Sequence, residues 1–388
     1  MPQLLLPACL SDQSGPLTNS PCSNCEPRTG SNKNRRLSAI VTIPPLASRL
    51  HCLCMEVPLN RAMKKIVNVI LIVVLFVACS YAQTPTLKVL PWNNHSAAVS
   101  LTFDDSRAVH LDVAIPELNK RHLRATFFLI VSKTTRIDEW RKIQSQGHEI
   151  GNHSVTHEHS ADLNKASEEL QVEDAKKFLD NNFNSTILTF AYPYTEVSPG
   201  LLYWVKRYDF AARGGRGDGS LVYIKAEAQP DWYNLPSQPS YTKYDATVYQ
   251  GWIDKALVMS AWTTLQIHGI GDASTGFEPI PSNTFIAFLD YLKAAQARGL
   301  WVAPFGEVAA YFRAQKIVEA VQAQVANGEA KFSWQIPTPF PHGVVLKVAL
   351  NGSTRARLYQ AGHELRRGKD GTYSVAFDSR ELVVKGQL

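Results

Sequence analysis

Adjacent carboxylates and closely spaced histidines are the residues of this 388-residue chain most able to perform hydrolytic chemistry. Asp104 and Asp105 are neighbours, and His153 and His157 are four residues apart. Two adjacent carboxylates cannot face one point equally, so we expect one to act as a base and the other as a ligand. The histidine spacing puts both rings on one face if that segment turns helically, which suits a divalent metal. With one aspartate added, the set predicts a hydrolytic metal site that keeps open positions for water and substrate.

Each of these signals has a plainer interpretation when it is taken alone. The two histidines could be surface residues, the paired aspartates a helix N-cap or turn, and His268 a core histidine. Their shared position favours the functional interpretation, because each cluster follows a predicted strand. The clusters are Asp104-Asp105, 152–157, 191–194 and 265–269. Parallel strands of a barrel end at one face, where such folds keep their active sites, so we expect the clusters to converge.

Short apolar runs alternate with amphipathic stretches after Pro91, which predicts a parallel sheet, open or closed into a barrel. The predicted strands are 97–103, 125–131, 148–152, 187–191, 210–213, 263–268 and 300–303. The predicted helices are 110–121, 137–146, 165–181, 201–207, 284–297 and 305–326. The stretch 234–251 is rich in Pro, Ser and Tyr and is predicted to be a long loop over one face.

The sequence pattern changes beyond Asn327-Gly328, where short strand-like segments predict a small all-β appendage over 330–388. The predicted strands are 344–350, 355–360, 373–377 and 382–384. The first two flank Asn351-Gly352 and are predicted to pair as a hairpin.

The order of motifs resembles that of the polysaccharide deacetylase, or NodB-homology, family, which is carbohydrate esterase family four. The motifs are Thr-Phe-Asp-Asp, His-Ser-x-x-His, x-x-Pro-Tyr, Asp-Trp and Leu-x-x-His, within residues 95–315. The resemblance implies an α/β fold, a distorted (β/α) barrel over 90–326. It also implies a hydrolase that uses a divalent metal, most commonly zinc, to remove acetyl groups from N-acetylated sugars or acetylated xylan.

Carried over position by position, the resemblance implies that Asp105, His153 and His157 bind the metal. It further implies that Asp104 is the general base and that His268 is the acid that protonates the leaving group. Such a pair makes chemical sense, because hydrolysis of an amide needs a base for water and an acid for the departing nitrogen.

Substrate contacts are implied at two further motifs. Pro193-Tyr194 would supply an oxyanion contact through the backbone amide of Tyr194. Asp231-Trp232 is the candidate for the fourth motif, with Asp231 orienting His268 and Trp232 lining the sugar groove. A turn aspartate and a core tryptophan are an equally good interpretation of this pair.

Two positions depart from the family pattern. Ala191 stands where an arginine usually steadies the base, and we hypothesise that Arg213, at the end of a neighbouring strand, replaces it. Ser106 stands where glycine is usual, which would alter the loop and leave the ligands in place.

Residues 63–82 have the form of a secretory signal peptide, with Met63-Lys-Lys followed by an apolar run too short for a comfortable membrane span. Cleavage after Ala82 would give a mature start at Gln83. Acylation of Cys79 as a lipoprotein is the less favoured alternative. Residues 1–62 lack periodicity and are interpreted as a leader without a fold, although two cysteine pairs, Cys22/Cys25 and Cys52/Cys54, could also be a zinc or redox site.

Charge separates this leader from the rest of the chain. The net charge is +6, but residues 1–82 hold eight Lys and Arg against three Asp and Glu, so the remainder is nearly neutral. A nucleic-acid partner is therefore not expected, nor is a membrane span in the mature protein. All six cysteines precede residue 80, so no disulfide is expected after cleavage.

Three functions remain open. The favoured one is a secreted or periplasmic deacetylase acting on an acetylated glycan. The alternatives are a hydrolase of small cyclic amides and a non-catalytic glycan-binding envelope protein of the same fold. The sequence indicates neither the glycan nor the oligomeric state.

Overall fold

The computed structural model describes residues 86–215, 222–351 and 356–386. The leader at 1–62 and the signal segment at 63–82, with all the cysteines, lie outside these residues. Among the described residues, none of the helices is both long and apolar enough to cross a lipid bilayer.

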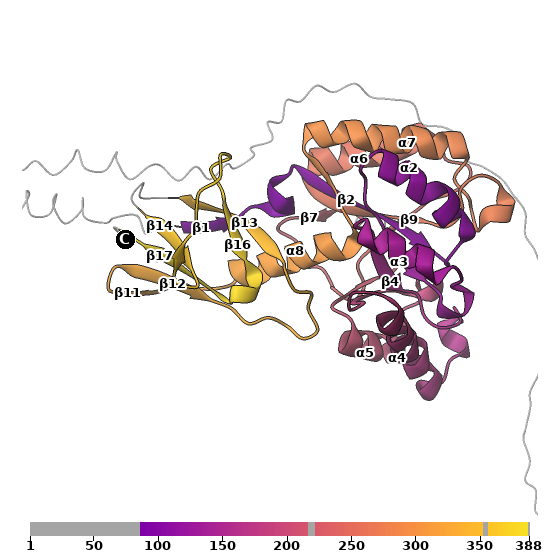
Figure 1. Ribbon diagram of the computed structural model, residues 1–388, viewed down its shortest axis with the longest axis horizontal. Coiled ribbons are helices and arrows are strands. Elements are labelled where there is room, and N and C mark those ends of the chain that lie inside the picture. The colour runs from indigo at the N-terminus through magenta and orange to yellow at the C-terminus, as the bar shows by residue number, and fades with distance from the viewer. Residues whose placement is uncertain (1–85, 216–221, 352–355, 387–388) are drawn as a thin grey trace, which may run out of the picture. The chain divides into compact units, whose positions relative to one another are not determined.

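A curved sheet of parallel strands forms the centre of the fold (Figure 1). In chain order the strands are β2 (Ala97–Asp104), β3 (Thr126–Leu129), β4 (Glu149–Asn152), β5 (Thr189–Ala191), β6 (Ala211–Arg213), β9 (Ala261–Ile267) and β10 (Leu300–Val302). Their order across the sheet is β6-β5-β4-β3-β2-β9, with β10 also paired to β2. Two-residue strands, β7 (Ile224–Lys225) and β8 (Gln238–Pro239), both pair with β9.

An irregular segment closes the ring between the outer strands β6 and β9. Leu235 forms a parallel bridge with Arg213 of β6, and β8 pairs in parallel with β9. The amide of Gly214 donates to the carbonyl of Leu235 at 2.8 Å, and that of Ser240 donates to Gln266 at 2.9 Å. The predicted α/β fold, a distorted (β/α) barrel, is therefore confirmed, and its last wall is an irregular segment that contains Leu235 and β8.

Alternation along the long strands decides which side chains face the barrel interior. In β2, residues 97, 99, 101 and 103 are Ala, Val, Leu and Phe and belong to the core beneath the helices. The alternate residues Ser100, Thr102 and Asp104 are polar and fully buried. In β9, Gln266 is likewise a buried polar residue between the core residues Leu265 and Ile267. The strand pattern thus points Asp104 and Gln266 toward the same interior.

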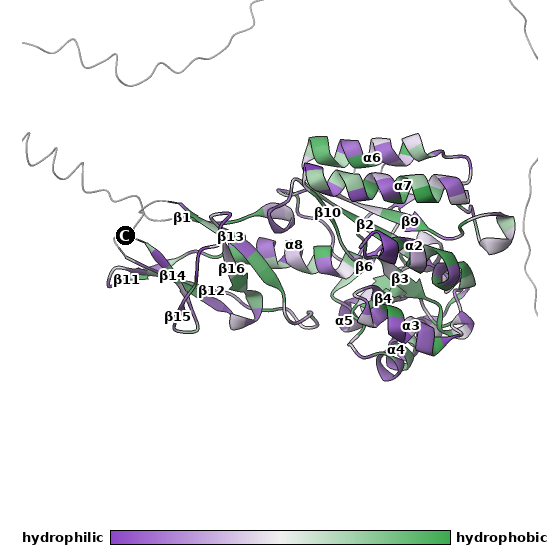
Figure 2. Cartoon of the chain, turned by 45° about the horizontal axis from the view of Figure 1, so that its top comes forward, coloured by the Kyte–Doolittle hydropathy of each residue, from purple (hydrophilic) through white to green (hydrophobic). Residues whose placement is uncertain are grey.

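Amphipathic helices cover the sheet. They are α2 (Ile115–Lys120), α3 (Ile137–Ser145), α4 (Lys165–Asn182), α5 (Pro199–Tyr208), α6 (Ala246–Met259), α7 (Ser282–Ala295) and α8 (Phe305–Glu319). Figure 1 shows α6 and α7 side by side near β2 and β9, and hydrophobic and hydrophilic residues alternate along both helices in Figure 2. Their apolar faces supply Tyr249, Ile253, Phe285 and Phe288 to the core.

The amino end of α8 lies against the opposite end of the barrel from the strand termini that carry the motifs. Glu149, at the start of β4, accepts hydrogen bonds from the amide of Gly306 at 2.7 Å and from the hydroxyls of Thr126 and Thr189. A carboxylate at a helix amino end satisfies unpaired amides and complements the helix dipole. Glu149 is thus a structural residue, distinct from the chemistry at the carboxyl ends of the strands.

The C-terminal appendage consists of two antiparallel sheets, ordered β1-β13-β16 and β11-β12-β17-β14-β15. Their strands are β1 (Thr86–Val89), β11 (Gln324–Ala326), β12 (Glu329–Ser333), β13 (Val345–Asn351), β14 (Arg357–Gln360), β15 (His363–Glu364), β16 (Tyr373–Ala376) and β17 (Glu381–Lys385). The strand β1 precedes the barrel in sequence, yet it pairs with β13 of the appendage. One hydrophobic cluster contains both α8 and appendage residues such as Leu346 and Val375.

Three predicted elements need correction. The predicted loop 234–251 contains β8 and the first turns of α6, whose start is capped by the Asp245 carboxylate. The helix predicted over 305–326 ends at Glu319, and Gln324–Ala326 pairs with β12 around the Asn327-Gly328 turn. The strands β13 and β14 do not form the predicted hairpin, because they belong to different sheets.

Candidate active site

The predicted motif clusters converge at the carboxyl ends of the parallel strands. Asp104 and Asp105 stand at the end of β2, His153 directly follows β4, and Arg213 ends β6. His268 follows β9. These residues surround the floor of a cleft of about 920 Å³, whose lining includes Asp105, His153 and His268.

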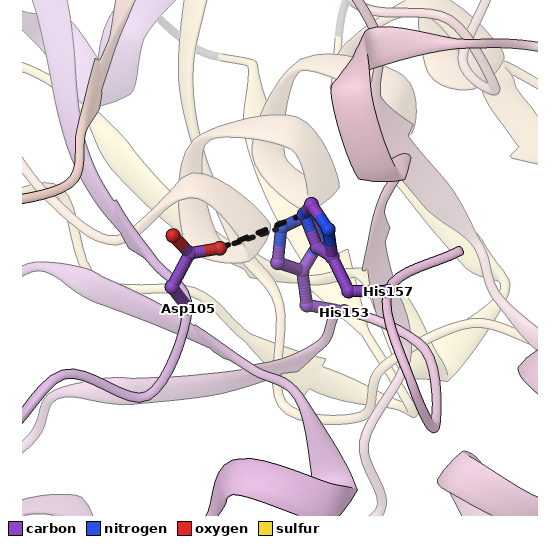
Figure 3. A group of neighbouring side chains, drawn as sticks. All are labelled: Asp105, His153 and His157. Carbon is purple, nitrogen blue, oxygen red and sulfur yellow. Dashed lines mark ion pairs between the residues drawn. The ribbon is translucent and has the colours of Figure 1, made fainter. Parts of the chain in front are cut away.

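Asp105, His153 and His157 form the one group of three potential metal ligands found among the described residues (Figure 3). Their ligand atoms all lie within 4.8 Å of one another. Asp105 Oδ1 is 3.7 Å from Nε2 of His153 and 3.6 Å from Nε2 of His157. The structure therefore brings together the three residues predicted as ligands.

The protonation pattern of this triad fits a cation. His153 Nδ1 lies 2.7 Å from the carbonyl oxygen of Ala191 and must donate to it, so the unprotonated Nε2 faces Asp105. Asp105 Oδ1 is buried and has no hydrogen-bond partner among the described residues. Imidazole nitrogens and a carboxylate oxygen that converge without a proton between them are stabilised by a divalent metal. The three residues thus fit the metal that the resemblance implies.

Burial adjusts the pKa values of these groups toward metal binding. It lowers the pKa of His157 to about 4, and the nearby His153 and Lys133 act in the same direction. The pKa of His153 is also lowered, mainly by burial. For Asp105, burial raises the pKa, but the histidines and Arg107 outweigh it, so the pKa lies below its usual value. At neutral pH the site therefore holds neutral imidazoles and an ionised carboxylate, the forms that bind metal.

The loop that holds His157 is not helical. The His-x-x-x-His spacing would place both imidazoles on one face of a helical turn, and the structure differs on this point. Ser154 and His157 have φ angles of 70° and 65°. The Ser154 hydroxyl accepts a hydrogen bond from the His157 amide at 3.0 Å, and Gln171 of α4 accepts from the amides of Val155 and Thr156. A turn bound to α4, and not a helical face, places the two imidazoles together.

Asp104 lies beneath the triad with no exposed surface. Its Oδ2 accepts hydrogen bonds from Arg213 Nη2 at 2.6 Å and from Gln266 Nε2 at 3.1 Å, while its Oδ1 is buried and has no partner in the part of the chain that the structure describes. Burial raises the pKa of Asp104, but the charge of Arg213, and those of nearby histidines whenever they are protonated, outweigh it and hold the pKa well below its usual range. Asp104 is therefore ionised at neutral pH and retains one oxygen able to accept a proton.

Arg213 occupies the place predicted for it. In the pairing of β5 with β6, Arg213 lies directly opposite Ala191, the position where the family pattern has an arginine. The guanidinium thus lies on the adjacent strand, at the same level of the barrel as position 191. Its side chain is fully buried, and Phe128 lies beneath it with its ring centroid 5.2 Å away.

His268 faces Asp104 across the site. Its Nε2 is 3.8 Å from Asp104 Oδ2, and its backbone carbonyl accepts a 2.6 Å hydrogen bond from His110 Nε2. His268 Nδ1 is buried without a hydrogen-bond partner. The ring of Phe277 lies edge-on to the imidazole at a centroid distance of 5.4 Å.

The prediction for Asp231 and Trp232 is wrong. Asp231 is exposed, and its carboxylate accepts a hydrogen bond from the amide of Tyr233 and not from His268. Trp232 packs against Phe312 of α8, in the cluster shared with the appendage, and it does not line the cleft. Both residues belong to the kinked segment that closes the barrel, which turns them away from its interior.

Pro193 and Tyr194 begin a single 3-10 turn after β5. The first amides of such a turn have no acceptor within it, so the Tyr194 amide is suited to bind an oxyanion. The Tyr194 ring lines the cleft between His157, at a centroid distance of 4.5 Å, and His159, on which it stacks at 3.5 Å. The ring therefore buttresses a predicted metal ligand.

Sequence reasoning missed Gln266, Arg107, His110 and Lys133. The signal for Gln266 was available, because it precedes His268 by two residues and so shares its strand face. Arg107 donates to Asp105 Oδ2 at 2.9 Å, and it follows the paired aspartates directly. His110 and Lys133 carry no local signal, since only the packing of distant loops brings them to the site.

Residues 93–212 match the family described as polysaccharide deacetylase. A peptidoglycan-N-acetylglucosamine deacetylase of Bacillus cereus is 29% identical over 122 residues, which are 31% of this chain and 44% of that protein. A gellan lyase of Bacillus sp is 22% identical over 246 residues, 56% of this chain and 9% of that protein. The chain thus spans less than half the length of these curated relatives.

Solved structures of the same family are also similar to this chain. A family 4 acetyl xylan esterase from Clostridium thermocellum, in complex with cobalt, is 21% identical with a TM-score of 0.38, over 54% of this chain and 89% of that one. The motif residues that meet at the barrel's carboxyl end and the sequence match over residues 93–212 agree: this part of the chain carries the sequence pattern of the polysaccharide deacetylase family, carbohydrate esterase family four.

Proposed function

We propose that the protein is a metal-dependent hydrolase that removes acetyl groups from an acetylated glycan. The observation that supports this proposal is that a potential metal site lies directly beside a candidate general base and a candidate general acid. A ligand triad with an unpartnered Asp105 oxygen lies beside a buried, ionised Asp104, with His268 Nε2 3.8 Å from that carboxylate. A non-catalytic binding protein has no need of a buried carboxylate with a free oxygen next to a ligand triad.

The roles of the residues follow from their surroundings. A divalent metal held by Asp105, His153 and His157 supplies Lewis acidity toward an acyl oxygen and lowers the pKa of water. Asp104 accepts the proton of the attacking water at its free Oδ1, because Arg213 and Gln266 occupy Oδ2.

The opposite side of the site deals with the leaving group and the developing charge. His268 donates a proton to the leaving nitrogen or oxygen of the sugar as the acyl bond breaks. The Tyr194 amide donates to the oxyanion of the tetrahedral intermediate. Water adds to the carbonyl carbon, the bond to the sugar breaks, and acetate and the free amine or hydroxyl are released.

The test is acetate release by residues 83–388 loaded with Zn²⁺ and offered acetylated chitin oligomers, peptidoglycan and xylan. We expect acetate from at least one glycan, none after chelation, and recovery when the metal is restored. The control is Asp104→Asn, which keeps the ligand triad and should bind metal without releasing acetate. Stoichiometric metal with no acetate from any glycan would contradict the proposal and favour the binding-protein or small-amide alternatives.

We further propose that the protein is exported through residues 63–82. The support is the basic, apolar and small-residue pattern of that segment. Mass spectrometry of the protein from the culture medium or periplasm should find Gln83 as its first residue. Lipid on Cys79 would establish the lipoprotein alternative, and an intact segment in the cytoplasm would contradict export.

A further inference from the structure

The charged side chains that line the cleft include more cations than carboxylates. Apart from the histidines and the tyrosines Tyr194 and Tyr241, the ionisable groups among the described residues are one carboxylate, Asp105, and two cations, Arg107 and Lys133. Asp105 belongs to the metal triad. Asp104, beneath the floor, is fully buried and ion-paired with Arg213. A divalent metal would add further positive charge, so the loaded cleft presents a cationic surface to its ligand.

The two cations stand on neighbouring loops, and hydrogen bonds of Ser106 connect these loops. Serine at this position departs from the family pattern, in which glycine is usual. Ser106 precedes Arg107, and its hydroxyl accepts a hydrogen bond from the Ile130 amide at 2.8 Å and contacts the Thr134 hydroxyl at 2.9 Å. Both partners flank Lys133, in the turn after β3. A glycine at position 106 could make neither bond, so Ser106 holds the two basic loops in a set relation.

Neither cation is fully satisfied within the described residues. Lys133 is exposed and forms no ion pair with them. Arg107 donates through Nη2 to Asp105, while its Nε is buried without a partner. Lys133, which is unpaired within the described residues, and Arg107, which keeps donors beyond its bond to Asp105, are placed to receive an anion.

Aromatic rings on the same cleft point to the rest of the ligand. Tyr194 and Phe277 both line it, and they are 49% and 61% exposed. Exposed apolar side chains that gather on one cleft, unlike those scattered singly over a surface, mark ligand-binding grooves. Their flat apolar faces suit the C–H faces of sugar rings, and the cations suit an acidic substituent.

We propose that the cleft takes an anionic glycan, in which a carboxylate or phosphate group on or beside the acetylated sugar binds Lys133 and Arg107. The inference rests on the proposed function for the ligand being an acetylated glycan, and it adds the acidic group as the feature that selects among glycans.

The test compares oligosaccharides of equal length by isothermal titration calorimetry with the zinc-loaded protein. One is a neutral N-acetylglucosamine oligomer, one carries lactyl carboxylates on alternate sugars, and one carries phosphate esters. At low salt we expect at least one anionic oligomer to bind about tenfold more tightly than the neutral one, and the difference to shrink at 0.5 M NaCl because salt screens exposed charges. The preferred anion then distinguishes carboxylate from phosphate.

Substitutions at position 133 assign the effect. Lys133→Glu should weaken binding of the preferred anionic oligomer about tenfold, Lys133→Gln about threefold, and neither should change binding of the neutral one. Lys142→Glu, the same charge change on the exposed surface of α3, should change neither, and metal content should be equal in all variants.

The outcomes separate this inference from the proposed function. Equal affinity for neutral and anionic oligomers, or no effect of Lys133→Glu, overturns the inference even where acetate is released. Charge-dependent binding that depends on Lys133, without acetate from any oligomer, supports the inference and overturns the catalytic proposal.

Discussion

Arg213 Nη2 lies 2.6 Å from Asp104 Oδ2, and both side chains are completely buried. The remaining guanidinium nitrogens, Nε and Nη1, have no hydrogen-bond partner, so the ion pair is the main compensation for the buried arginine charge. Removing one member of such a pair leaves the other charge buried and unpaired, which is costly. The ion pair therefore couples the ionisation of Asp104, the proposed base, to the folding stability of the barrel.

Arg213→Ala should lower kcat/KM by about a hundredfold or more and the free energy of unfolding by about 3 kcal/mol. Asp104 loses its strongest partner and the cation that keeps its pKa low. Kinetics on the preferred acetylated glycan and urea denaturation measure the two effects. Unchanged activity in this variant would rule out a role for Arg213 in steadying the base.

The matched control moves the arginine back to the strand where the family pattern has it. Because Ala191 and Arg213 are paired across β5 and β6, the double variant Ala191→Arg/Arg213→Ala places a guanidinium at the same level of the barrel. We expect it to recover at least tenfold in kcat/KM over Arg213→Ala. A double variant no better than the single one would show that the two positions are not equivalent.

Gln266→Leu should reduce kcat/KM by about tenfold to a hundredfold, because it removes a hydrogen bond to a charged group worth about 1.5–3 kcal/mol. The affected bond is the one from Gln266 Nε2 to Asp104 Oδ2. Gln315→Leu serves as the control, since Gln315 is a buried glutamine of α8 outside the cleft. Both variants should lose stability and only Gln266→Leu should lose activity at saturating metal; equal losses of activity would contradict the assignment.

Sequence periodicity could predict the barrel and the convergence at its carboxyl end, because both follow from patterns within one strand. The run from Ala97 to Asp104 is long and buried, and the alternation of apolar and polar residues along it decides that Asp104 faces inward. The ligands Asp105 and His153 then follow from strand polarity alone. Arg213 could be predicted for the same reason, since it ends a strand next to the one that lost its arginine.

Relations between distant segments could not be predicted in this way. Asp231 and Trp232 lie in a segment whose direction is decided by hydrogen bonds to β6, and those bonds place Trp232 against α8. The pairing of β1 with β13 joins residues more than 250 positions apart. The helix α6 is different, because its apolar residues Tyr249, Ile253 and Ala256 carried a helical period that the proline- and tyrosine-rich stretch before it obscured.

Metal affinity should change little between pH 8 and pH 5. Protons compete with a metal only below the pKa of the ligand, and the pKa of His157 is lowered to about 4, chiefly by burial, with that of His153 lowered as well. A histidine with an ordinary pKa near 6.5 would instead cost about thirtyfold at pH 5. Titration with Co²⁺ followed by visible absorbance measures the affinity, and a fall of tenfold or more between pH 7 and pH 5 would contradict the prediction.

Asp209, far from the chemistry, should make the fold less stable as pH rises. Both of its carboxylate oxygens are buried without partners, and burial raises its pKa to about 8. The folded state therefore prefers the protonated form, whereas the unfolded chain ionises near pH 4, so this residue's contribution is fully present below pH 4 and is lost toward pH 8.

Between pH 5 and pH 8 the unfolding free energy should fall by about 3 kcal/mol relative to that of Asp209→Asn, which cannot ionise. Urea denaturation at both pH values measures the difference, and Asp231→Asn, the same change at an exposed position, should show no such dependence. Parallel pH profiles for wild type and Asp209→Asn would show that Asp209 is ionised, and hence solvated or paired, in the folded protein.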